Sequence, residues 1–329
     1  MSSMNNRPLL VCLTATRNYG WCTKAFLEAN SMWADYIIVV DQMSTDCTRE
    51  LCAQYEKVIV VDNTDLSYSE TVRCTLAINK AREIPGDKIF IYLAIDEVLS
   101  ANALTSNDWM KLLKSKPSEV GLLKWANICE NGRNYVPSNK SDGTPYWMAR
   151  IFHDDGVTPY DNDGLDMHTH CIPYPKNAKE FFIDDFVILH LERYHTQWSL
   201  DKNIYYQFVD LNKNNRSAVK LDRMYNYVRD NGVAMPLNAE WVNYEFNIFE
   251  SIDLSDNDFF YQQIKGFIDV HGIERYAKLN VWNKRLITYL GKSDPRTLFC
   301  KVLHRYLNIT RGKKNVFVRA IDKMLTFVI

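Results

Sequence analysis

Several features that would place this chain in a familiar class are missing from its sequence. No GxGxxG follows the first apolar run and no GxxxxGK[ST] occurs anywhere, so neither dinucleotide binding nor P-loop phosphate transfer has support. No segment approaches the ~20 consecutive apolar residues of a membrane-spanning helix. The amino-terminal apolar run of five residues is too short for a secretory leader. We therefore expect a cytoplasmic protein.

The eight cysteines also lack a pattern. None forms a CxxC pair, which argues against a cysteine-rich zinc site, and several lie in apolar runs as reduced buried thiols do. The formal net charge is only −1, so we expect no nucleic-acid partner. This charge is unevenly placed, because residues 292–329 carry net +7 and the preceding residues net −8.

What the sequence does contain is an alternation of apolar runs and helical patterns over its first 125 residues. Apolar strands separated by helices predict an α/β domain with a mostly parallel sheet flanked by helices. The predicted strands are 9–14, 36–40, 57–61, 88–93 and 120–125. The predicted helices are 19–33, 45–55, 69–84 and 106–113, with Ser69 and Ser106 as amino-terminal caps.

The rest of the chain differs in character. Residues 126–194 are irregular and rich in Asn, Asp, Gly and Pro, with strand-like pieces at 147–152 and 186–191. A helical pattern follows Trp198 to the end, with predicted helices that include 238–252 and 273–289. We expect three parts: a ligand-binding domain at 1–198, a helical region packed on it at 199–291, and basic amphipathic helices at 292–329.

Polar side chains follow the predicted strands at the point where each strand ends. Arg17 follows the first strand, Asp41 the second, Asp62 the third and Asp96-Glu97 the fourth. In parallel sheets, ligands bind beyond the carboxyl ends of the strands. These residues are therefore the first candidates for ligand contacts.

Three segments resemble a known family in their order and spacing. They are LTATRNYGWCTKAFLEAN, YIIVVDQMSTDCT and YLAIDEVLS. On these motifs the chain resembles family 2 glycosyltransferases of the Rossmann-like GT-A fold, of the bacterial surface-polysaccharide type. That family shows Arg-Asn-Glu, Asp-Asn-Gly-Ser-Thr-Asp-Gly-Thr and Leu-Asp-Ala-Asp-Glu-Phe-Leu at these places. The likeness covers roughly residues 1–100, with weaker similarity to about residue 203.

The resemblance implies that the sheet edge binds a nucleotide-sugar donor. It assigns to the donor Thr14, Arg17, Asp41, Arg73, Ile95, Asp96 and Arg150. It also implies a Mn²⁺ or Mg²⁺ ion held by Asp96, Glu97 and His190, since hard cations take carboxylate oxygens together with phosphate oxygens. Ala94 replaces the first Asp of the family's Asp-Xaa-Asp motif, which removes one carboxylate.

Some of these positions have a structural alternative beside the functional one. Arg150 either reaches the diphosphate or is a surface strand residue, and His190 is either a ligand or a hydrogen-bonded core histidine. An inverting transferase also needs a carboxylate that takes the proton from the acceptor hydroxyl. Asp166 is the first candidate, with Asp163 in the same segment DNDGLDMHTH, and Asp154 and Asp155 remain as alternatives.

The basic residues at the carboxyl terminus are interleaved with apolar stripes at helical spacing. Basic amphipathic helices of this kind lie in an anionic membrane interface. The alternative is that these helices cap the helical region or form an oligomer contact.

These observations lead to one main functional hypothesis and two alternatives. The main hypothesis is an inverting glycosyltransferase, peripheral on the inner face of the membrane, that moves a sugar from a nucleotide diphosphate, with UDP favoured. Its acceptor would be a hydroxyl of a glycan or lipid-linked oligosaccharide in cell-surface polysaccharide synthesis, with residues 199–291 on the acceptor side. The first alternative is a degenerate transferase that binds a glycan or serves as a membrane scaffold, which Ala94 would explain. The second is a sugar nucleotidylyltransferase, although the glycine-rich first turn typical of such enzymes is missing.

Overall fold

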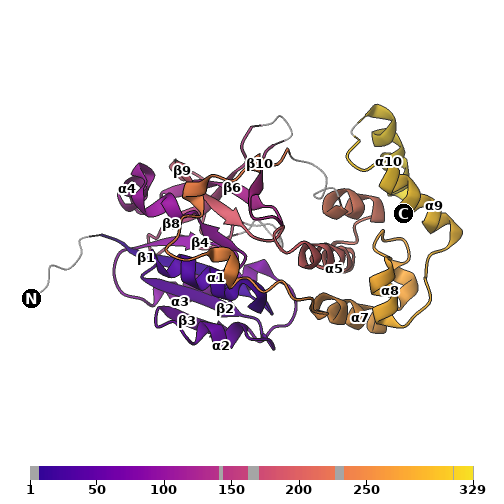
Figure 1. The fold of residues 1–329 in the computed structure, drawn as a ribbon, viewed down its shortest axis with the longest axis horizontal. Coiled ribbons are helices and arrows are strands. Elements are labelled where there is room, and N and C mark those ends of the chain that lie inside the picture. The colour runs from indigo at the N-terminus through magenta and orange to yellow at the C-terminus, as the bar shows by residue number, and fades with distance from the viewer. Residues whose placement is uncertain (1–6, 141–143, 162–169, 227–232, 314, 329) are drawn as a thin grey trace, which may run out of the picture. The chain divides into compact units, whose positions relative to one another are not determined.

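The chain forms two compact units. The computed structural model describes residues 7–140, 144–161, 170–226, 233–313 and 315–328, and Figure 1 labels its elements. The first unit consists of Met1–Tyr194 and Ala234–Ser255, and the second of His195–Val233 and Asp256–Ile329. The predicted catalytic residues Asp163 and Asp166 lie outside the described residues.

A parallel sheet forms the amino-terminal part of the first unit. Its four strands lie in the order β4-β1-β2-β3. They are β1 (Leu9–Thr16), β2 (Tyr36–Asp41), β3 (Val58–Asp62) and β4 (Lys88–Tyr92). The connecting helices are α1 (Gly20–Ser31), α2 (Thr48–Cys52) and α3 (Glu70–Arg82). This arrangement confirms the predicted α/β class.

The sheet continues beyond β4 with mostly antiparallel pairs. It adds β8 (Trp147–His153), β6 (Val120–Ile128), β7 (Asn134–Pro137) and β10 (Met235–Pro236), each antiparallel to its neighbour. Strand β9 (Glu180–His190) pairs parallel to β6 and antiparallel to β5 (Glu97–Leu99). The short helices η1 (Ala101–Thr105) and α4 (Asn107–Leu113) follow β5.

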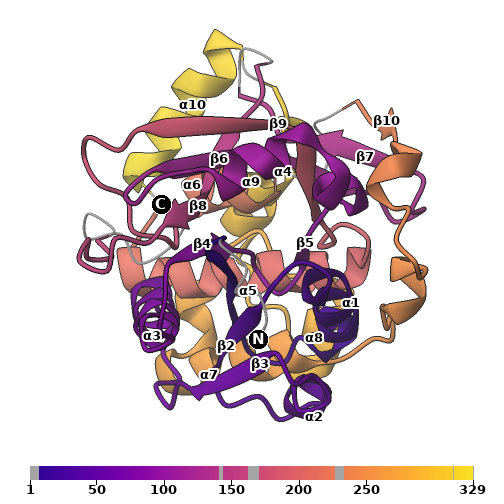
Figure 2. The same cartoon turned by 90° about the vertical axis from the view of Figure 1, so that its left-hand side faces the viewer.

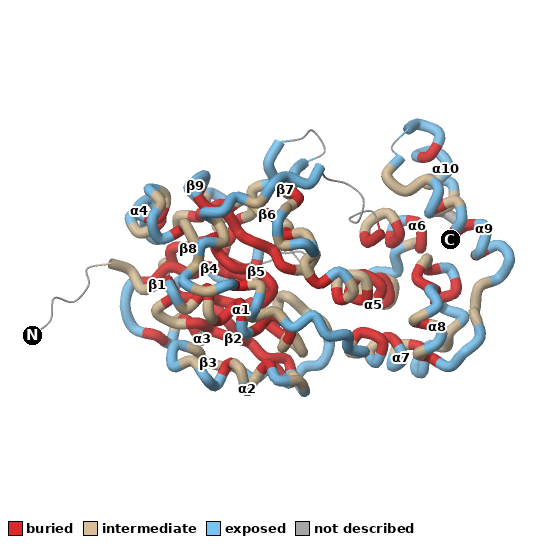
Figure 3. Tube along the Cα trace, in the orientation of Figure 1, coloured by how far each residue is buried: buried red, intermediate tan, exposed pale blue. Residues whose placement is uncertain are grey.

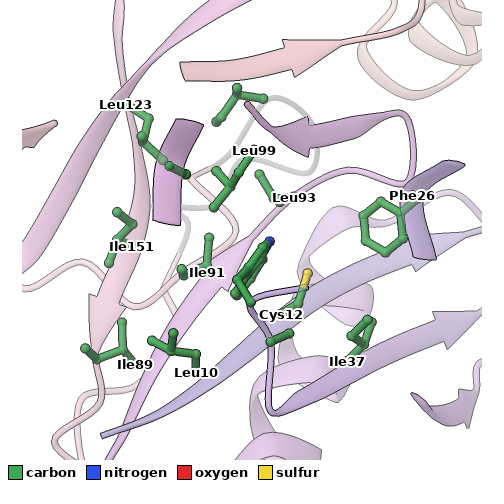
Figure 4. Close-up of a cluster of buried hydrophobic side chains, with 14 of the residues drawn as sticks. Leu10, Cys12, Phe26, Ile37, Ile89, Ile91, Leu93, Leu99, Leu123 and Ile151 are labelled. Carbon is green, nitrogen blue, oxygen red and sulfur yellow. The ribbon is translucent and has the colours of Figure 1, made fainter. Parts of the chain in front are cut away.

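The core of the first unit lies on both faces of the sheet, because successive side chains of a strand point to opposite sides. On β1, Leu10 and Cys12 pack with Phe26 of α1 (Figure 4). On the same strand, Val11 and Leu13 belong to the cluster that holds α3. Figure 2 shows α1 and α3 on opposite sides of these strands, and Figure 3 shows that the strands are buried. Burying each such side chain contributes about 1.5–3 kcal/mol.

Local capping explains where the helices of the first unit begin. Ser69 Oγ accepts a hydrogen bond from the Val72 amide at 3.3 Å and Ser106 Oγ from the Trp109 amide at 3.1 Å, so both predicted caps are confirmed. Helix α2 begins only at Thr48, later than predicted, because the Asp46 carboxylate accepts from the Thr48 amide and holds the preceding loop outside the helix.

The segment Ala234–Ser255 is not the continuous helix predicted at 238–252. It contains β10 and the 3-10 turns η4 (Ala239–Trp241) and η5 (Ile248–Ser251). Asn238 and Asn247 cap these turns with their side chains. Since β10 pairs with β7, this stretch belongs to the first unit.

The second unit is helical. Its elements are α5 (Thr196–Asn214), α6 (Ala218–Leu221), the π-helix η2 (Asp222–Asn226), α7 (Phe259–His271), η6 (Ile273–Tyr276), α8 (Lys284–Leu290), α9 (Leu298–Ile309) and α10 (Val316–Val328). Phe208, Tyr261 and Tyr276 are buried at its centre. The helix predicted at 273–289 is interrupted between Tyr276 and Lys284. Among the described residues, no helix is long and apolar enough to cross a bilayer.

Candidate functional site

The carboxyl ends of β1, β2 and β3 bring three polar residues side by side. The strand register sets Thr16 opposite Asp41, and Asp41 opposite Asp62. Asp41 is buried, and its Oδ2 accepts from Arg49 Nη1 at 2.8 Å and from the Ser44 amide at 3.1 Å. Arg49 also donates to Asp62 at 2.7 Å. The sequence interpretation missed Arg49, because a helical arginine next to a strand-end acid is common in any α/β protein.

Three buried oxygens of β1 and β2 have no hydrogen-bond partner in the described part of the chain. Asp41 Oδ1, Thr14 Oγ1 and Thr16 Oγ1 make no hydrogen bond to any residue that the structure describes. A buried polar group left unpaired costs about 1–3 kcal/mol. A carboxylate oxygen accepts only, whereas a hydroxyl both accepts and donates. A ligand that supplies an N–H or O–H to Asp41 would therefore recover this cost.

Two of the three arginines predicted for the donor site, Arg17 and Arg73, contact the loop that follows β3. Arg73 donates to the side-chain oxygen of Gln42, the residue that follows Asp41, and its guanidinium lies 4.7 Å from the centre of the Tyr68 ring. Arg17 Nη1 lies 3.4 Å from the carbonyl of Leu66. Arg73 is thus adjacent to Asp41 through Gln42.

A second cluster lies beyond β4. Asp96, His190 and Glu192 each offer one ligand atom, and these three atoms lie within 4.8 Å of one another. His190 Nε2 is 3.6 Å from Asp96 Oδ2 and 3.6 Å from Glu192 Oε2. Glu192 was not among the predicted ligands. An acid two residues after a strand-end histidine was the available signal.

Strand pairing assembles this Asp-His-Glu centre. The β5–β9 register sets Glu97 opposite His190, and the Leu191 amide donates to the Asp96 carbonyl at 2.8 Å. Burial alone would lower the pKa of His190, but the carboxylates of Asp96, Glu192 and Glu97 raise it above its ordinary 6.5. A concentration of negative charge this strong favours a bound cation.

The donor set of this centre fits a divalent cation. Two carboxylates and one imidazole suit Mn²⁺ well, and Mg²⁺ would rely on the carboxylates and on phosphate oxygens. The structure thus brings together Asp96 and His190, both of which were predicted as ligands. His190 is also buried and hydrogen-bonded to Asn127, as expected for a core histidine.

Glu97, predicted as a third ligand, does not converge with them. Its Oε2 accepts from the Ala94 amide at 2.8 Å and its Oε1 lies 3.3 Å from Arg150 Nη2. Arg150 is buried rather than a surface residue, with its guanidinium 5.4 Å from the ring centre of Tyr92 and 5.7 Å from that of Trp125. The two charges form a buried ion pair.

The remaining predicted donor residue, Ile95, packs in the core, and its carbonyl accepts from the Cys22 thiol at 3.4 Å. In the sheet, β1 separates β4, which precedes Asp96, from β2, which ends in Asp41. Both halves lie at the same edge of the sheet.

Comparisons with known proteins give little beyond this geometry. No protein family matches the chain, and no curated protein sequence matches it significantly. One similar structure is the 4-diphosphocytidyl-2C-methyl-D-erythritol synthase of Anaerococcus prevotii, at 9% identity over 54% of this chain and 88% of that one, with a TM-score of 0.34. Another is the inositol-1-phosphate CTP transferase of T. maritima, at 10% identity over 55% and 89%, with a TM-score of 0.35.

A third similar structure is glucosyl-3-phosphoglycerate synthase of Mycobacterium tuberculosis, in complex with Mn²⁺, UDP and glucosyl-3-phosphoglycerate. It shares 16% identity over 36% of this chain and 44% of its own, with a TM-score of 0.27. This chain thus matches less than half of that enzyme. Because all three TM-scores are low, the function is inferred from the residues of the site itself.

Proposed function

We propose that the protein is a metal-dependent glycosyltransferase with a nucleotide-diphosphate sugar, UDP-linked, as its donor. The observation that carries this proposal is the pairing of two features at one sheet edge. Asp41 Oδ1, at the end of β2, is a buried acceptor without a described partner, and Asp96, His190 and Glu192 converge beyond the end of β4. A nucleotide sugar needs both a polar pocket for its nucleoside and a charge partner for its diphosphate.

The nucleoside half of the site favours a base that donates a hydrogen bond to Asp41. Uracil carries a ring N–H that can donate a hydrogen bond, and a carboxylate oxygen such as Asp41 Oδ1 would accept it. Thr14 and Thr16 offer hydroxyls on the neighbouring strand. Arg17 and Arg73 contact the loop after β3 and would supply positive charge, and Arg73 also binds Gln42, which follows Asp41.

The diphosphate half would hold the leaving group. When bound, Mn²⁺ or Mg²⁺ supplies the positive charge that stabilises the departing diphosphate. Asp96, His190 and Glu192 would hold the ion. Ala94 removes one carboxylate of the family's motif. Glu192, which the motif does not include, would supply a second carboxylate to the ion in its place.

Transfer with inversion needs a base for the acceptor hydroxyl. We assign this role to Asp166 or Asp163, on the motif argument given above. The proton would pass to the carboxylate as the hydroxyl oxygen attacks the anomeric carbon and the bond to the diphosphate breaks. The acceptor would be a glycan or a lipid-linked oligosaccharide of a cell-surface polysaccharide.

Calorimetric titration with UDP, GDP, CMP and TDP, each with and without Mn²⁺, tests the donor site. Wild type, Asp96→Ala and Asp41→Asn would be compared, with Glu83→Gln as a control because Glu83 lies in an exposed ion pair with Lys80. We expect UDP binding that needs Mn²⁺ and falls at least tenfold in Asp96→Ala and Asp41→Asn but not in Glu83→Gln. The absence of binding by every nucleotide would contradict the proposal.

A product assay separates the enzyme classes. Release of UDP from UDP-sugars, with sugar transferred to a glycan, supports glycosyl transfer. Release of pyrophosphate from a nucleoside triphosphate and a sugar phosphate would identify a nucleotidylyltransferase instead. Metal-dependent nucleotide binding without either product would favour the degenerate transferase.

A membrane surface is proposed as the place where the acceptor is met. Helix α10 leaves Val316, Phe317 and Met324 exposed, with Phe317 82% exposed, while Asp322 faces inward and pairs with Arg223. Helix α9 likewise exposes Leu298, Phe299 and Val302. The basic residues between and beside these side chains are Lys301, Arg305, Arg311, Lys313, Arg319 and Lys323. Exposed apolar side chains beside cations match an anionic bilayer surface.

Co-sedimentation with lipid vesicles tests this surface. Replacing Arg319 and Lys323 by Gln removes two cations, each worth about 1 kcal/mol at an anionic surface, so binding should fall about thirtyfold. Val157→Ser is a matched control, because Val157 is 80% exposed but lies in the first unit. Equal binding of wild type to anionic and to neutral vesicles would contradict the electrostatic part of the proposal.

A further inference from the structure

The imidazole of His190 is held on the side away from the Asp-His-Glu centre. Its Nδ1 lies 3.0 Å from Asn127 Oδ1, and its ring stacks on Trp125 with centroids 4.6 Å apart and planes 10° from parallel. The register between β6 and β9 sets Asn127 opposite His190 and Trp125 opposite Ile188. Both contacts therefore come from one strand.

The orientation of the Asn127 amide is determined by its other end. Asn127 Nδ2 donates to the carbonyl of Val136 at 3.1 Å, and Val136 lies opposite Asn127 on β7. A carbonyl only accepts, so the amide nitrogen must face Val136 and the amide oxygen must face His190. The oxygen in turn only accepts, so in the neutral ring Nδ1 carries the proton.

This chain of donors and acceptors decides which nitrogen has a lone pair. With the proton on Nδ1, Nε2 carries the lone pair, and Nε2 is the atom that lies 3.6 Å from both Asp96 and Glu192. We infer that Asn127 sets the tautomer of His190 and is a positioning residue for its role as a metal ligand. Trp125 holds the plane of the ring. The inference rests on the metal centre of the proposed function.

Asn127 belongs to none of the sequence motifs of the donor site. A hydrogen bond to the far nitrogen of a ligating histidine orients the ring, and its loss typically weakens metal binding about 10- to 100-fold. Asn127→Leu removes the acceptor with little change of size. Asn127→Asp keeps an acceptor oxygen for Nδ1. Asn134→Leu is a matched control on the adjacent strand β7, where Asn134 lies opposite Pro236 of β10 rather than opposite His190.

Two measurements test the inference. Nitrogen-15 NMR of the histidine rings of the metal-free protein in alkaline buffer reports which nitrogen of His190 is protonated. Electron paramagnetic resonance of free Mn²⁺ reports the metal dissociation constant. We expect the Nδ1–H tautomer in wild type and a dissociation constant about 10- to 100-fold higher in Asn127→Leu, with Asn127→Asp and Asn134→Leu within about threefold of wild type.

The outcomes separate this inference from the proposed function. A proton on Nε2 in wild type overturns the inference, even if Asn127→Leu does not fold. Unchanged Mn²⁺ affinity in Asn127→Leu overturns it as well. If wild type shows the Nδ1–H tautomer but binds no Mn²⁺ with or without UDP, the metal centre itself fails and the positioning role fails with it.

Discussion

Replacing Glu97 by Gln should destabilise the first unit strongly. The Glu97 and Arg150 side chains are only 1% and 6% exposed, and their charges lie 3.3 Å apart. Removing one charge leaves the Arg150 guanidinium buried without its counter-ion, which costs about 3–5 kcal/mol. The substituted amide oxygen would still accept from the Ala94 amide, so the main-chain contact is retained. At about 2–4 °C per kcal/mol for a unit of this size, the melting temperature should fall by about 6–20 °C.

Urea unfolding in the presence of EDTA measures this cost without any contribution from metal binding. Glu83→Gln is the control, since Glu83 pairs with Lys80 on the surface and such pairs contribute about 0–1 kcal/mol. The double variant Glu97→Gln with Arg150→Met should recover most of the loss, because it leaves no unpaired charge. If Glu97→Gln costs no more than Glu83→Gln, the two charges are not a buried pair and the reasoning is refuted.

Three further predictions concern stability. Burial lowers the pKa of His304 below its ordinary 6.5, despite the hydrogen bond to the Lys278 carbonyl. The unfolded chain therefore binds more protons than the folded chain as the pH falls through this range. Denaturant unfolding of the second unit should show stability that falls from pH 7 to pH 5, and falls less steeply in His304→Gln. Gly121→Ala should cost about 1–3 kcal/mol in urea, because its Cβ would lie 2.8 Å from Ile151 Cβ; an unchanged midpoint would show that the strands can separate. Ser106→Ala removes the cap of α4 and should cost about 0.5–2 kcal/mol, which an unchanged melting curve would contradict.

Local signals in the sequence were enough to predict the parallel strands and the caps of two helices. Continuous apolar runs such as YIIVV can only be buried on both faces, and they became the parallel strands β1 to β4. Ser69 and Ser106 cap the helices that they were predicted to cap. Asp41 is the last residue of β2 and Asp96 comes four residues after the end of β4, so both lie at or just past the carboxyl end of a parallel strand, as predicted.

Contacts between distant segments could not be predicted in this way. Asn127 and His190 are 63 residues apart, and Arg150 and Glu97 are 53 apart. Their meeting depends on which strands pair and in which register. A shift of one residue on β9 would turn the His190 side chain to the opposite face of the sheet.

The sequence by itself therefore determined the α/β class, the positions of the parallel strands along the chain, and the place of Asp41 and Asp96 at or beyond strand ends. The tertiary structure alone decided that Glu192 joins Asp96 and His190, that Glu97 turns to Arg150, and that Asn127 faces His190. The physical reason is range. Helix caps and strand periodicity depend on neighbours in the chain, whereas a ligand centre and a buried ion pair depend on the register of strands that are far apart in sequence.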